Sequence, residues 1–505
     1  MLPCSADTER VMQRIASGRR FGLAIALLAV VVLPLLFGSA GARAPKGLLR
    51  DFDAFYCAGD ALGRDRDPYR SEPLGSCERR PKPAIFRPGT PGLAMPAPLP
   101  PYALAPFILL ARLPFVAAAV AWSLLLLASI ALTVFALRRL TQLPLATLTA
   151  SVALIDGYAP LCLGQVAPLA VAGIALAALM LHEGRERSAA ALAALSMIEP
   201  HVALPACLAL FIFRPRSRSI LILSAAALTV LSFAVAGGTT NLEYLRDVLP
   251  AHALSEVANA KQISLTYGLH RLGMTDALAV RIGEIWYLAM IALGIAGARL
   301  AQKSGRSAAS LITLPVGLAL VGGPFVHVVQ IAAAMPAALL LFAESSGIVR
   351  RWLGAGIILV AVPWVQFSDL GTIFVALSAL VVGILIASLL QGRPALVAMG
   401  GLAAIAFGEV SIALLRPVPN VVALLLARYD PNALAEQSWT LYVRAIGPIN
   451  AHAFDVAKAP TVVGLLVLTF AAAYGLLHAT KIEPFSPLAS AKRKGAETSR
   501  RIAFR

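Results

Sequence analysis

Long apolar runs recur along most of this chain, and they limit what it can fold into. The first begins near residue 20, and others follow at short intervals up to residue 479. A helix needs about 20 apolar residues to cross a bilayer. A lipid-exposed backbone must also satisfy its own hydrogen bonds, which helices do. The sequence therefore predicts an all-α polytopic membrane helical bundle with about 12 to 13 spans.

Composition supports the same class of protein. Of the 505 residues, 59% are hydrophobic and 14% are charged, whereas a soluble domain is about 45–50% apolar and about 25% charged. The formal net charge of +17 is concentrated at the chain ends and in short loops, as in membrane proteins that keep basic residues inside. No long basic stretch contains interleaved aromatic residues, so we expect no nucleic-acid partner.

Two of the predicted spans contain breaks. Four prolines between residues 100 and 114 interrupt the run 100–137, so we expect a short broken or re-entrant segment followed by a full helix. Glu199-Pro200-His201 interrupts the run 188–213, which predicts two short helices or, alternatively, one tilted helix. The predicted spans lie near 20–41, 100–137, 144–162, 164–182, 188–213, 219–237, 278–299, 308–322, 326–343, 352–368, 371–390, 395–416 and 460–479.

The positions of the basic residues predict the topology. With the N-terminus inside, three polar loops fall outside, at 42–99, 238–277 and 417–459. We expect one membrane domain over residues 1–480 and a basic cytoplasmic tail over 481–505. The first apolar run resembles a secretory signal, but its length favours an uncleaved helix. The prediction is a multi-pass protein of the bacterial inner membrane with both termini cytoplasmic. Basic residues expected inside are Arg138, Arg185, Arg214, Lys303, Arg350, Arg393 and Lys481.

A short acidic and aromatic segment opens the first polar loop. In a helix, Phe52, Phe55 and Tyr56 would share one face, because they are spaced at i, i+3 and i+4. Asp51 would lie beside this face and Asp53 further round. Such a helix is expected to lie in the membrane interface, with a carboxylate at the boundary between water and lipid.

This segment carries a resemblance to a known family. It reads Asp51-Phe-Asp-Ala-Phe-Tyr-Cys-Ala-Gly-Asp60 and continues to Pro68-Tyr69. The pattern resembles the family-87 glycosyltransferases, polytopic enzymes of GT-C type that include polyprenyl-phosphate-mannose-dependent α-1,2-mannosyltransferases. Three later segments resemble the family in the same order: Pro100-Pro-Tyr-Ala-Leu-Ala-Pro106, Leu163-Gly-Gln165 and Gln262-Ile-Ser-Leu265.

The chain also departs from the family pattern. Glu199-Pro200 stands where the family often has Lys-Pro, so an anion replaces a possible phosphate-binding cation. The segment Gly322-Gly-Pro-Phe-Val-His327 only loosely resembles the corresponding family segment. We claim no resemblance beyond residue 345.

The resemblance implies an inverting sugar transfer that needs a general base. Asp51 matches the aspartate of the family pattern and is our candidate base, with Asp53 as second choice. A carboxylate suits this role, because partial burial raises its pKa toward neutrality. The simpler alternative is an acid that caps a helix or faces solvent. The leaving phosphate is stable as an anion, and we expect no metal and no cofactor beyond the polyprenyl-phosphate sugar.

Other polar residues are candidates for substrate binding. Histidine, glutamine and arginine side chains can hold a phosphate or a sugar hydroxyl, and ionisable groups inside a membrane are often functional. Each also has a structural alternative, such as helix capping, an internal ion pair or a solvated loop. The candidates are His327, Gln165, Gln262, Tyr56, Glu199, His201 and Arg271.

Two of the five cysteines lie in the first polar loop. Cys57 and Cys77 would form a disulfide if this loop is periplasmic, because that compartment is oxidising. Such a bond would brace the segment that carries Asp51. The alternative is two unrelated thiols.

The expected function is therefore a membrane glycosyltransferase. It would move a mannose-like sugar from a polyprenyl-phosphate donor to a lipid-linked or envelope glycan acceptor on the outer face, with membrane lipid as its surroundings. A transporter or lipid flippase that uses Glu199 and His201 is the alternative, and a non-catalytic assembly partner is a third possibility.

Overall fold

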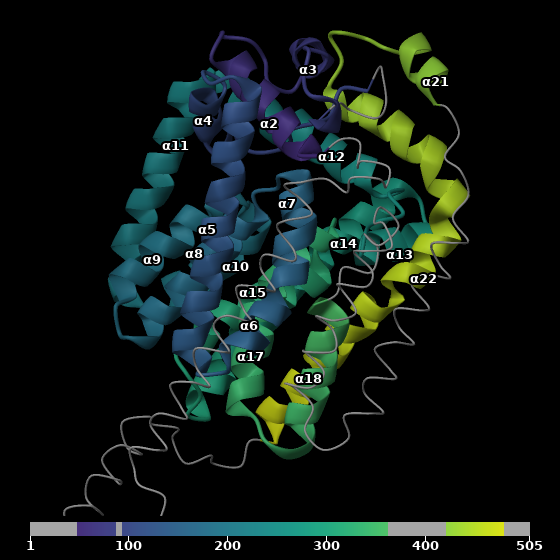
Figure 1. Ribbon diagram of the computed structural model, residues 1–505. Helices are drawn as coiled ribbons and strands as arrows, with labels where there is room; N and C mark the ends of the chain where they lie inside the picture. Colours follow the sequence, from purple (N-terminus) through teal and green to yellow (C-terminus); the bar gives the residue numbers. More distant parts are fainter. Residues whose placement is uncertain (1–47, 87–92, 362–420, 479–505) are drawn as a thin grey trace, which may run out of the picture.

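The computed structural model describes residues 48–86, 93–361 and 421–478 (Figure 1). All regular secondary structure in these ranges is helical, apart from an isolated β-bridge between Arg70 and Leu434. The predicted spans at 20–41, 371–390 and 395–416 and the tail 481–505 lie outside the described residues. The all-α class is confirmed.

Four of the described helices are long and apolar enough to cross a membrane, or up to five with a bent pair. They are α5 (Phe115–Thr141), α11 (Pro215–Glu243) with its continuation to α12 (Leu249–Glu256), α14 (Asp276–Lys303) and the second half of α22 (Ala435–Leu477). The bent pair is α6 (Leu145–Val152) with the segment that ends in α7 (Ala159–Leu163).

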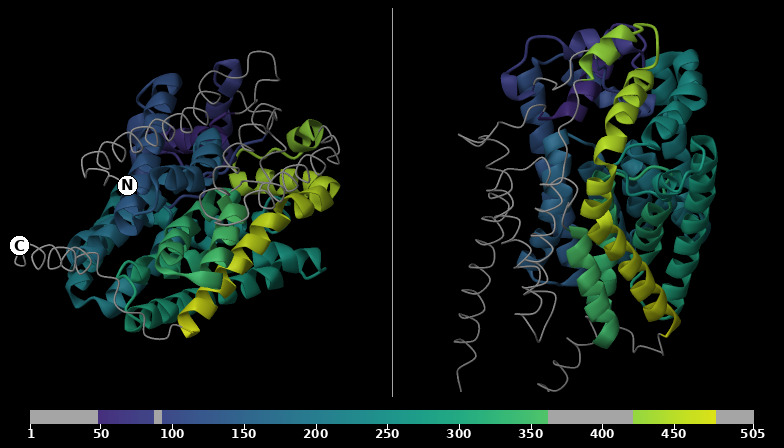
Figure 2. Two further views of the ribbon diagram at one scale, coloured as in Figure 1. Left: turned by 60° about the horizontal axis from the view of Figure 1, so that its bottom comes forward. Right: turned by 90° about the vertical axis from the view of Figure 1, so that its right-hand side faces the viewer.

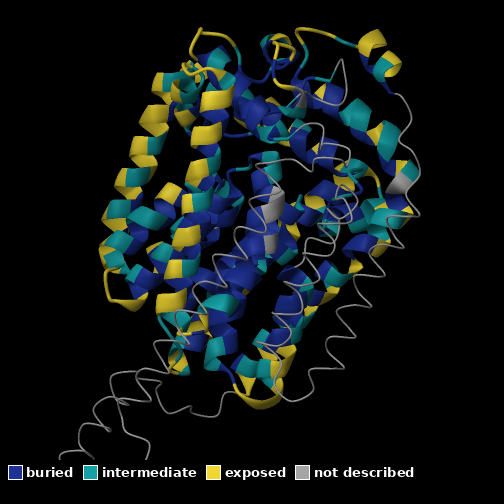
Figure 3. Ribbon diagram, viewed as in Figure 1, coloured by how far each residue is buried: buried dark blue, intermediate teal, exposed yellow. Residues whose placement is uncertain are grey.

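The outward faces of these helices are apolar. Leu223 and Val230 of α11 are 66% and 68% exposed. Most positions of α11 are exposed or intermediate, whereas α5 carries both exposed and buried positions (Figure 3). A large exposed apolar surface is rare in a soluble monomer. Lipid covers such a surface without cost, so the burial pattern agrees with a membrane bundle.

Shorter helices pack inside and between the long ones. They are α4 (Pro101–Leu110), α8 (Ala167–His182), α9 (Glu186–Leu195), α10 (Pro200–Phe213), α15 (Ser310–Gly322), α16 (Val328–Ile331), α17 (Met335–Glu344) and α18 (Gly347–Ala361). The broken run 100–137 is α4 followed by α5, as predicted. The run 188–213 is two helices with the break at Glu199, because Pro200 begins α10 and fits the first turn of a helix.

The second and third outer loops are largely helical. The second contains α12 and α13 (Leu265–Arg271). The third was expected to be polar loop up to residue 459, yet α22 begins at Ala435 and runs for 43 residues. Figure 2 shows this helix extending along the height of the bundle. Pro448 and Pro460 lie inside it, and the helix continues through both.

One end of the bundle carries α2 (Arg50–Leu62), α3 (Ser71–Glu78) and α21 (Val422–Ala427) (Figure 1). Helix α2 packs with its aromatic face inside the protein. Phe52 is 0% exposed and Phe55 is 3% exposed, and the Phe52 ring packs against Phe107, Phe115 and Trp122. The shared face of Phe52, Phe55 and Tyr56 is therefore buried against α4 and α5.

A close backbone approach sets the distance between α2 and α4. A Cβ atom added at Gly59 would lie 2.4 Å from the carbonyl carbon and oxygen of Phe107. Gly63, one turn later, has its nearest neighbour at 3.4 Å, which is ordinary van der Waals contact. Only the first glycine is required by the packing.

We expect Gly59→Ala to destabilise the protein by about 1–3 kcal/mol, because the added methyl group forces α2 away from α4. Gly63→Ala is the matched control and should leave stability nearly unchanged. Thermal unfolding in detergent measures both. Equal midpoints for the two variants would contradict this account of the α2–α4 contact.

A buried ion pair also anchors α2. Lys82 donates a hydrogen bond to Asp53, and their side chains are 3% and 5% exposed. Burial raises the pKa of Asp53 to about 6, although the neighbouring Lys82 ammonium lowers it. The Lys82 ammonium also lies 4.6 Å from the centre of the Phe115 ring. Removing one partner would leave a buried charge without its counter-ion.

We expect Lys82→Met to destabilise the protein by about 3–5 kcal/mol. The double variant D53N/K82M should be more stable than K82M, because neither charge then remains buried. Arg64→Met is the control: it breaks the exposed Arg64–Asp60 pair and should cost about 0–1 kcal/mol. Thermal unfolding tests the order, and a double variant no more stable than K82M would contradict it.

Candidate functional site

A large cavity lies inside the bundle between α2, α4, α10, α11, α12 and α22. Its volume is about 1570 Å³, and its walls are mostly apolar. Ligand sites typically combine such walls with a few converging polar groups. Polar side chains that line it include Asp51, Gln165, Glu199, His201, Glu256 and His327. Four of the sequence-predicted candidates therefore meet Asp51 in one cavity.

Asp51 lies in the first turn of α2 with its carboxylate at the cavity wall. Gln165 Nε2 donates a hydrogen bond of 2.5 Å to Asp51 Oδ2, and Arg50 Nε lies 3.6 Å from Oδ1. The Asp51 side chain remains 15% exposed. It is thus held by two neighbours but still open to the cavity.

The turn before Gln165 explains how that side chain reaches Asp51. Gly164 has φ of +74°, and a Cβ there would lie 2.5 Å from the Phe52 Cβ atom. Only glycine tolerates both conditions. The Gly164 carbonyl accepts a 2.8 Å hydrogen bond from Trp122 Nε1. The Leu163-Gly-Gln165 segment therefore docks against α2 and directs Gln165 to Asp51.

Four predicted site residues do not line this cavity: Gln262, which contacts His327 as described below, and Asp53, Tyr56 and Arg271. Asp53 faces Lys82 in the buried pair described above, so a catalytic role for it disagrees with the geometry. The Tyr56 hydroxyl donates a 2.8 Å hydrogen bond to the Leu113 carbonyl, so it ties α2 to the segment before α5. Arg271 Nε donates to Asp455 Oδ2 at 3.1 Å and joins α13 to α22. Each of these side chains connects elements of the fold instead of facing the cavity.

A disulfide bond links Cys57 of α2 to Cys77 of α3. Beside it, the buried Glu78 carboxylate accepts hydrogen bonds from the Met95 backbone N–H at 3.1 and 3.2 Å. The covalent bond attaches α3 to α2, and these hydrogen bonds attach Met95 to α3. They brace the helix that carries Asp51.

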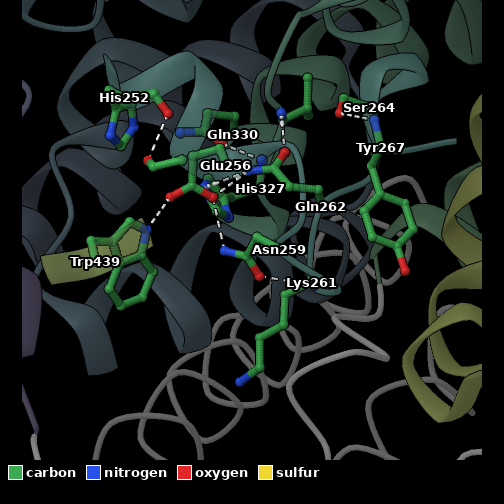
Figure 4. Close-up of polar contacts among 12 residues, drawn as sticks. His252, Glu256, Asn259, Lys261, Gln262, Ser264, Tyr267, His327, Gln330 and Trp439 are labelled. Carbon is green, nitrogen blue, oxygen red and sulfur yellow. Dashed lines mark hydrogen bonds and ion pairs between the residues drawn. The ribbon is translucent and has the colours of Figure 1, made fainter. Parts of the chain in front are cut away.

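His327 lies between α15 and α16, where it caps the N-terminus of α16 (Figure 4). Its backbone N–H donates to Gln330 Oε1 at 2.6 Å. Its Nε2 atom lies 3.2 Å from Glu256 Oε2 and 2.7 Å from Gln262 Nε2. The imidazole is therefore fixed by its own backbone and by two side chains from the second outer loop.

Glu256 is the residue that organises this cluster. Its carboxylate accepts hydrogen bonds from Trp439 Nε1 at 2.6 Å, Asn259 Nδ2 at 2.8 Å and Gln262 Nε2 at 2.9 Å. Sequence reasoning missed Glu256, because one acid in a loop predicted to be outside looks solvated. Trp439 was missed because it falls in a segment predicted to be a loop.

Carboxylates share the cavity with the His327 imidazole. Glu256 Oε2 lies 3.2 Å from its Nε2 atom, and Asp51 and Glu199 line the same cavity. Nearby carboxylates favour the protonated, cationic form of an imidazole. The geometry therefore allows a positive charge opposite Asp51 in the same cavity.

Glu199 and His201 adjoin this cluster at the start of α10. Glu199 Oε1 accepts a 3.1 Å hydrogen bond from Gln330 Nε2 and lies 3.4 Å from His201 Nε2. In the part of the chain that the structure describes, Glu199 Oε2 has no hydrogen-bond partner although it is buried. An acceptor of this kind at a cavity wall suits a ligand hydroxyl group.

Helix α22 supports the loop that carries Gln262. Lys458 Nζ donates to the carbonyl oxygens of Ala260 at 3.1 Å and Gln262 at 3.0 Å, and it pairs with Asp455 Oδ1 at 3.0 Å. The lysine is buried. Helix α22 therefore holds the 260–262 backbone while Trp439, also in α22, holds Glu256.

Within residues 48–86, 93–361 and 421–478, no group of three or more His, Cys, Asp or Glu side chains is arranged to hold a metal ion. The cluster around Glu256 is instead a hydrogen-bonded network of one carboxylate, two amides, one indole and one imidazole. Such a network suits the orientation of a charged organic ligand.

The model of glycosyltransferase family 87 matches residues 99–324. This range contains Gln165, Glu199, His201, Glu256 and Gln262, and it ends just before His327. No curated protein matches the chain closely enough to be called a relative. The match confirms the resemblance to family 87 over these residues, which make up less than half of the chain, and the described helices agree with a membrane protein.

Proposed function

We propose that this protein transfers a sugar, of mannose type, from a polyprenyl-phosphate donor to a hydroxyl group of a lipid-linked or envelope glycan acceptor. The observation that carries the proposal is the position of Asp51 and His327. The two side chains reach the same large apolar cavity from different parts of the chain. They supply a base and a cation, which are the two groups that this reaction needs.

Asp51 acts as the general base. The acceptor hydroxyl oxygen attacks the anomeric carbon of the sugar, and its proton passes to the Asp51 carboxylate. The bond between the anomeric carbon and the phosphate oxygen breaks, and the electron pair leaves with the phosphate. Gln165 donates to Oδ2, so Oδ1 is the oxygen that takes the proton.

His327 binds the donor phosphate as an imidazolium. Its charge offsets the negative charge that grows on the phosphate when the bond breaks. Glu256 holds the ring from the other side, and Arg50 and Lys261 also line the cavity. No separate acid is needed, because the phosphate leaves as a stable anion.

The size and walls of the cavity suit a lipid-linked substrate. Small-molecule sites commonly have volumes of about 300–1,000 Å³, and this cavity has about 1570 Å³. Leu204 of α10, Leu228 and Phe233 of α11 and Leu245 beyond it form one apolar wall. We assign this wall to the polyprenyl chain and the polar end to the sugar and the phosphate.

Glu199 and His201 bind sugar hydroxyl groups in this proposal. The unpartnered Glu199 Oε2 accepts a hydrogen bond from one hydroxyl, and His201 lines the wall beside it. A transporter or flippase would instead use these two residues for coupling. We favour the transferase, because Asp51, Gln165 and His327 share the cavity with them and the family match concerns glycosyl transfer.

We place the protein in the bacterial inner membrane with both termini cytoplasmic and the cavity on the outer side. The support is the distribution of basic residues along the sequence. The disulfide between Cys57 and Cys77 also agrees with an oxidising compartment on the α2 side.

We expect Asp51→Asn to reduce transfer by about 10²- to 10⁴-fold, because the amide cannot take the acceptor proton. Asp60→Asn is the matched control on the same helix; Asp60 pairs with Arg64 and Arg80 and should not affect turnover. Transfer is measured with a panel of polyprenyl-phosphate sugars at equal amounts of folded protein. Wild-type turnover in the D51N variant, with a donor that the wild type uses, would contradict the assignment.

His327→Gln should weaken donor binding by about 10- to 100-fold, because a hydrogen bond to a charged group contributes about 1.5–3 kcal/mol. His270→Gln serves as the control, since His270 pairs with Asp276 outside the cavity. The readout is KM for the donor, with KM for the acceptor measured in parallel. An unchanged donor KM in H327Q would remove His327 from the phosphate site.

A further inference from the structure

A second hollow lies at the far end of the helix pair α10 and α14. Its volume is about 580 Å³, and it shares no residue with the large cavity. Four of its larger apolar side chains are Ile212, Phe213, Ile295 and Leu300. Arg299 and Lys303 also line it. We call this hollow the α10–α14 groove.

The two cations of the groove lie on one face of α14. Arg299 and Lys303 are four residues apart, so their side chains are neighbours on the helix. The Arg299 guanidinium lies 5.4 Å from the centre of the Phe213 ring, which holds it over the groove. Among the described residues, neither cation forms an ion pair with a carboxylate. The groove therefore presents uncompensated positive charge beside apolar walls.

The position of the groove relative to the bilayer indicates its ligand. Helix α14 is one of the candidate spans, and Lys303 is its last residue. The cations therefore lie where lipid headgroups are, while Ile295 lies deeper along the same helix. Ile212 is 49% exposed and Leu300 is 38% exposed, so the walls are open to lipid chains.

The same end of the bundle is basic in general. Arg138 and Arg139 end α5, and Arg214, Arg216 and Arg218 lie at the start of α11. This is the end that the charge distribution predicts to be cytoplasmic. The cytoplasmic leaflet carries anionic lipids, and basic pockets between membrane helices bind their headgroups.

We propose that the α10–α14 groove binds one anionic phospholipid. Its phosphate would contact Arg299 and Lys303, and an acyl chain would lie against Ile212, Ile295 and Leu300. The inference is independent of sugar transfer, because it concerns charge and shape at the opposite end of the helices.

The bound lipid stabilises a helix pair that also builds the large cavity. At the other end of this pair, the Tyr287 hydroxyl of α14 donates a 2.6 Å hydrogen bond to the His201 carbonyl of α10. A lipid in the groove would contact both helices near their C-terminal ends. The bound lipid is expected to change the stability of the protein, since a ligand that binds only the folded state raises the unfolding midpoint.

The test compares lipid-dependent unfolding midpoints of three proteins in mixed micelles. Phosphatidylglycerol is added to the full chain, with phosphatidylcholine as the neutral reference. The test variant is R299Q/K303Q. The matched control is R350Q/R351Q, which removes the same charge; Arg350 also lies over a phenylalanine ring, 4.3 Å from the centre of Phe342, but outside the groove.

We expect phosphatidylglycerol to raise the midpoint of the wild type and the control equally, and R299Q/K303Q to lose roughly half of that rise or more. Ala296→Phe should cause a similar loss, because it fills the groove without altering charge. If R299Q/K303Q does not fold, the lipid-dependent midpoint of Ala296→Phe provides the test. Equal rises in all proteins, or equal losses in the test and control variants, would overturn the proposal.

Discussion

The burial of α2 is the constraint on which the rest of the site depends. Its aromatic face packs on α4 and α5, and Asp53 beside that face forms the buried pair with Lys82. The aromatic contact is closely packed, and breaking the ion pair would leave a buried charge without its partner, so both are costly to disturb. Together they fix the rotation of the helix. Asp51, on the other flank of Phe52, faces the cavity.

The opposite wall depends on a different kind of interaction. Glu256 is buried and accepts hydrogen bonds from three donors while it faces His327. A network of this kind is rigid when every member is satisfied, since each unmade bond in a low-dielectric interior is expensive. Its members come from α12, the following loop, the start of α16 and α22. Lys458 of α22 holds the loop by two backbone carbonyls. Helix α22 lies outside the family-matched residues 99–324, so residues beyond that match also support the site.

These two walls make the cavity asymmetric in charge. A carboxylate near the surface of the cavity lies on one side, and an imidazole backed by carboxylates lies on the other. Dipoles and charges that are fixed before the substrate arrives need no reorganisation during the reaction. The α10–α14 groove would add a lipid-dependent support at the far end of the helices that carry His201 and Tyr287.

Much of the fold was predictable from sequence, because apolar length and proline position have direct physical meaning. The break before α5 and the break at Glu199 follow from prolines that cannot continue a helix. The meeting of Asp51 and Gln165 was not predictable from spacing, since it depends on Gly164 docking against Phe52. Asp53 and Tyr56 were placed near the site because helical periodicity shows which residues share a face of α2. It does not show which other segment of the chain that face contacts. Glu256 and Trp439 were missed because their significance arises only from contacts between segments 183 residues apart.

The central claim is that donor phosphate and acceptor hydroxyl meet between His327 and Asp51. A structure of the protein with a bound, non-transferable polyprenyl-phosphate sugar analogue tests it most directly, through the distances from the phosphate to His327 and from the anomeric carbon to Asp51. We expect the phosphate within hydrogen-bond distance of the His327 imidazole and the anomeric carbon facing Asp51, with the lipid chain along α11. A phosphate bound elsewhere, with Asp51 turned away from the sugar, would contradict the account.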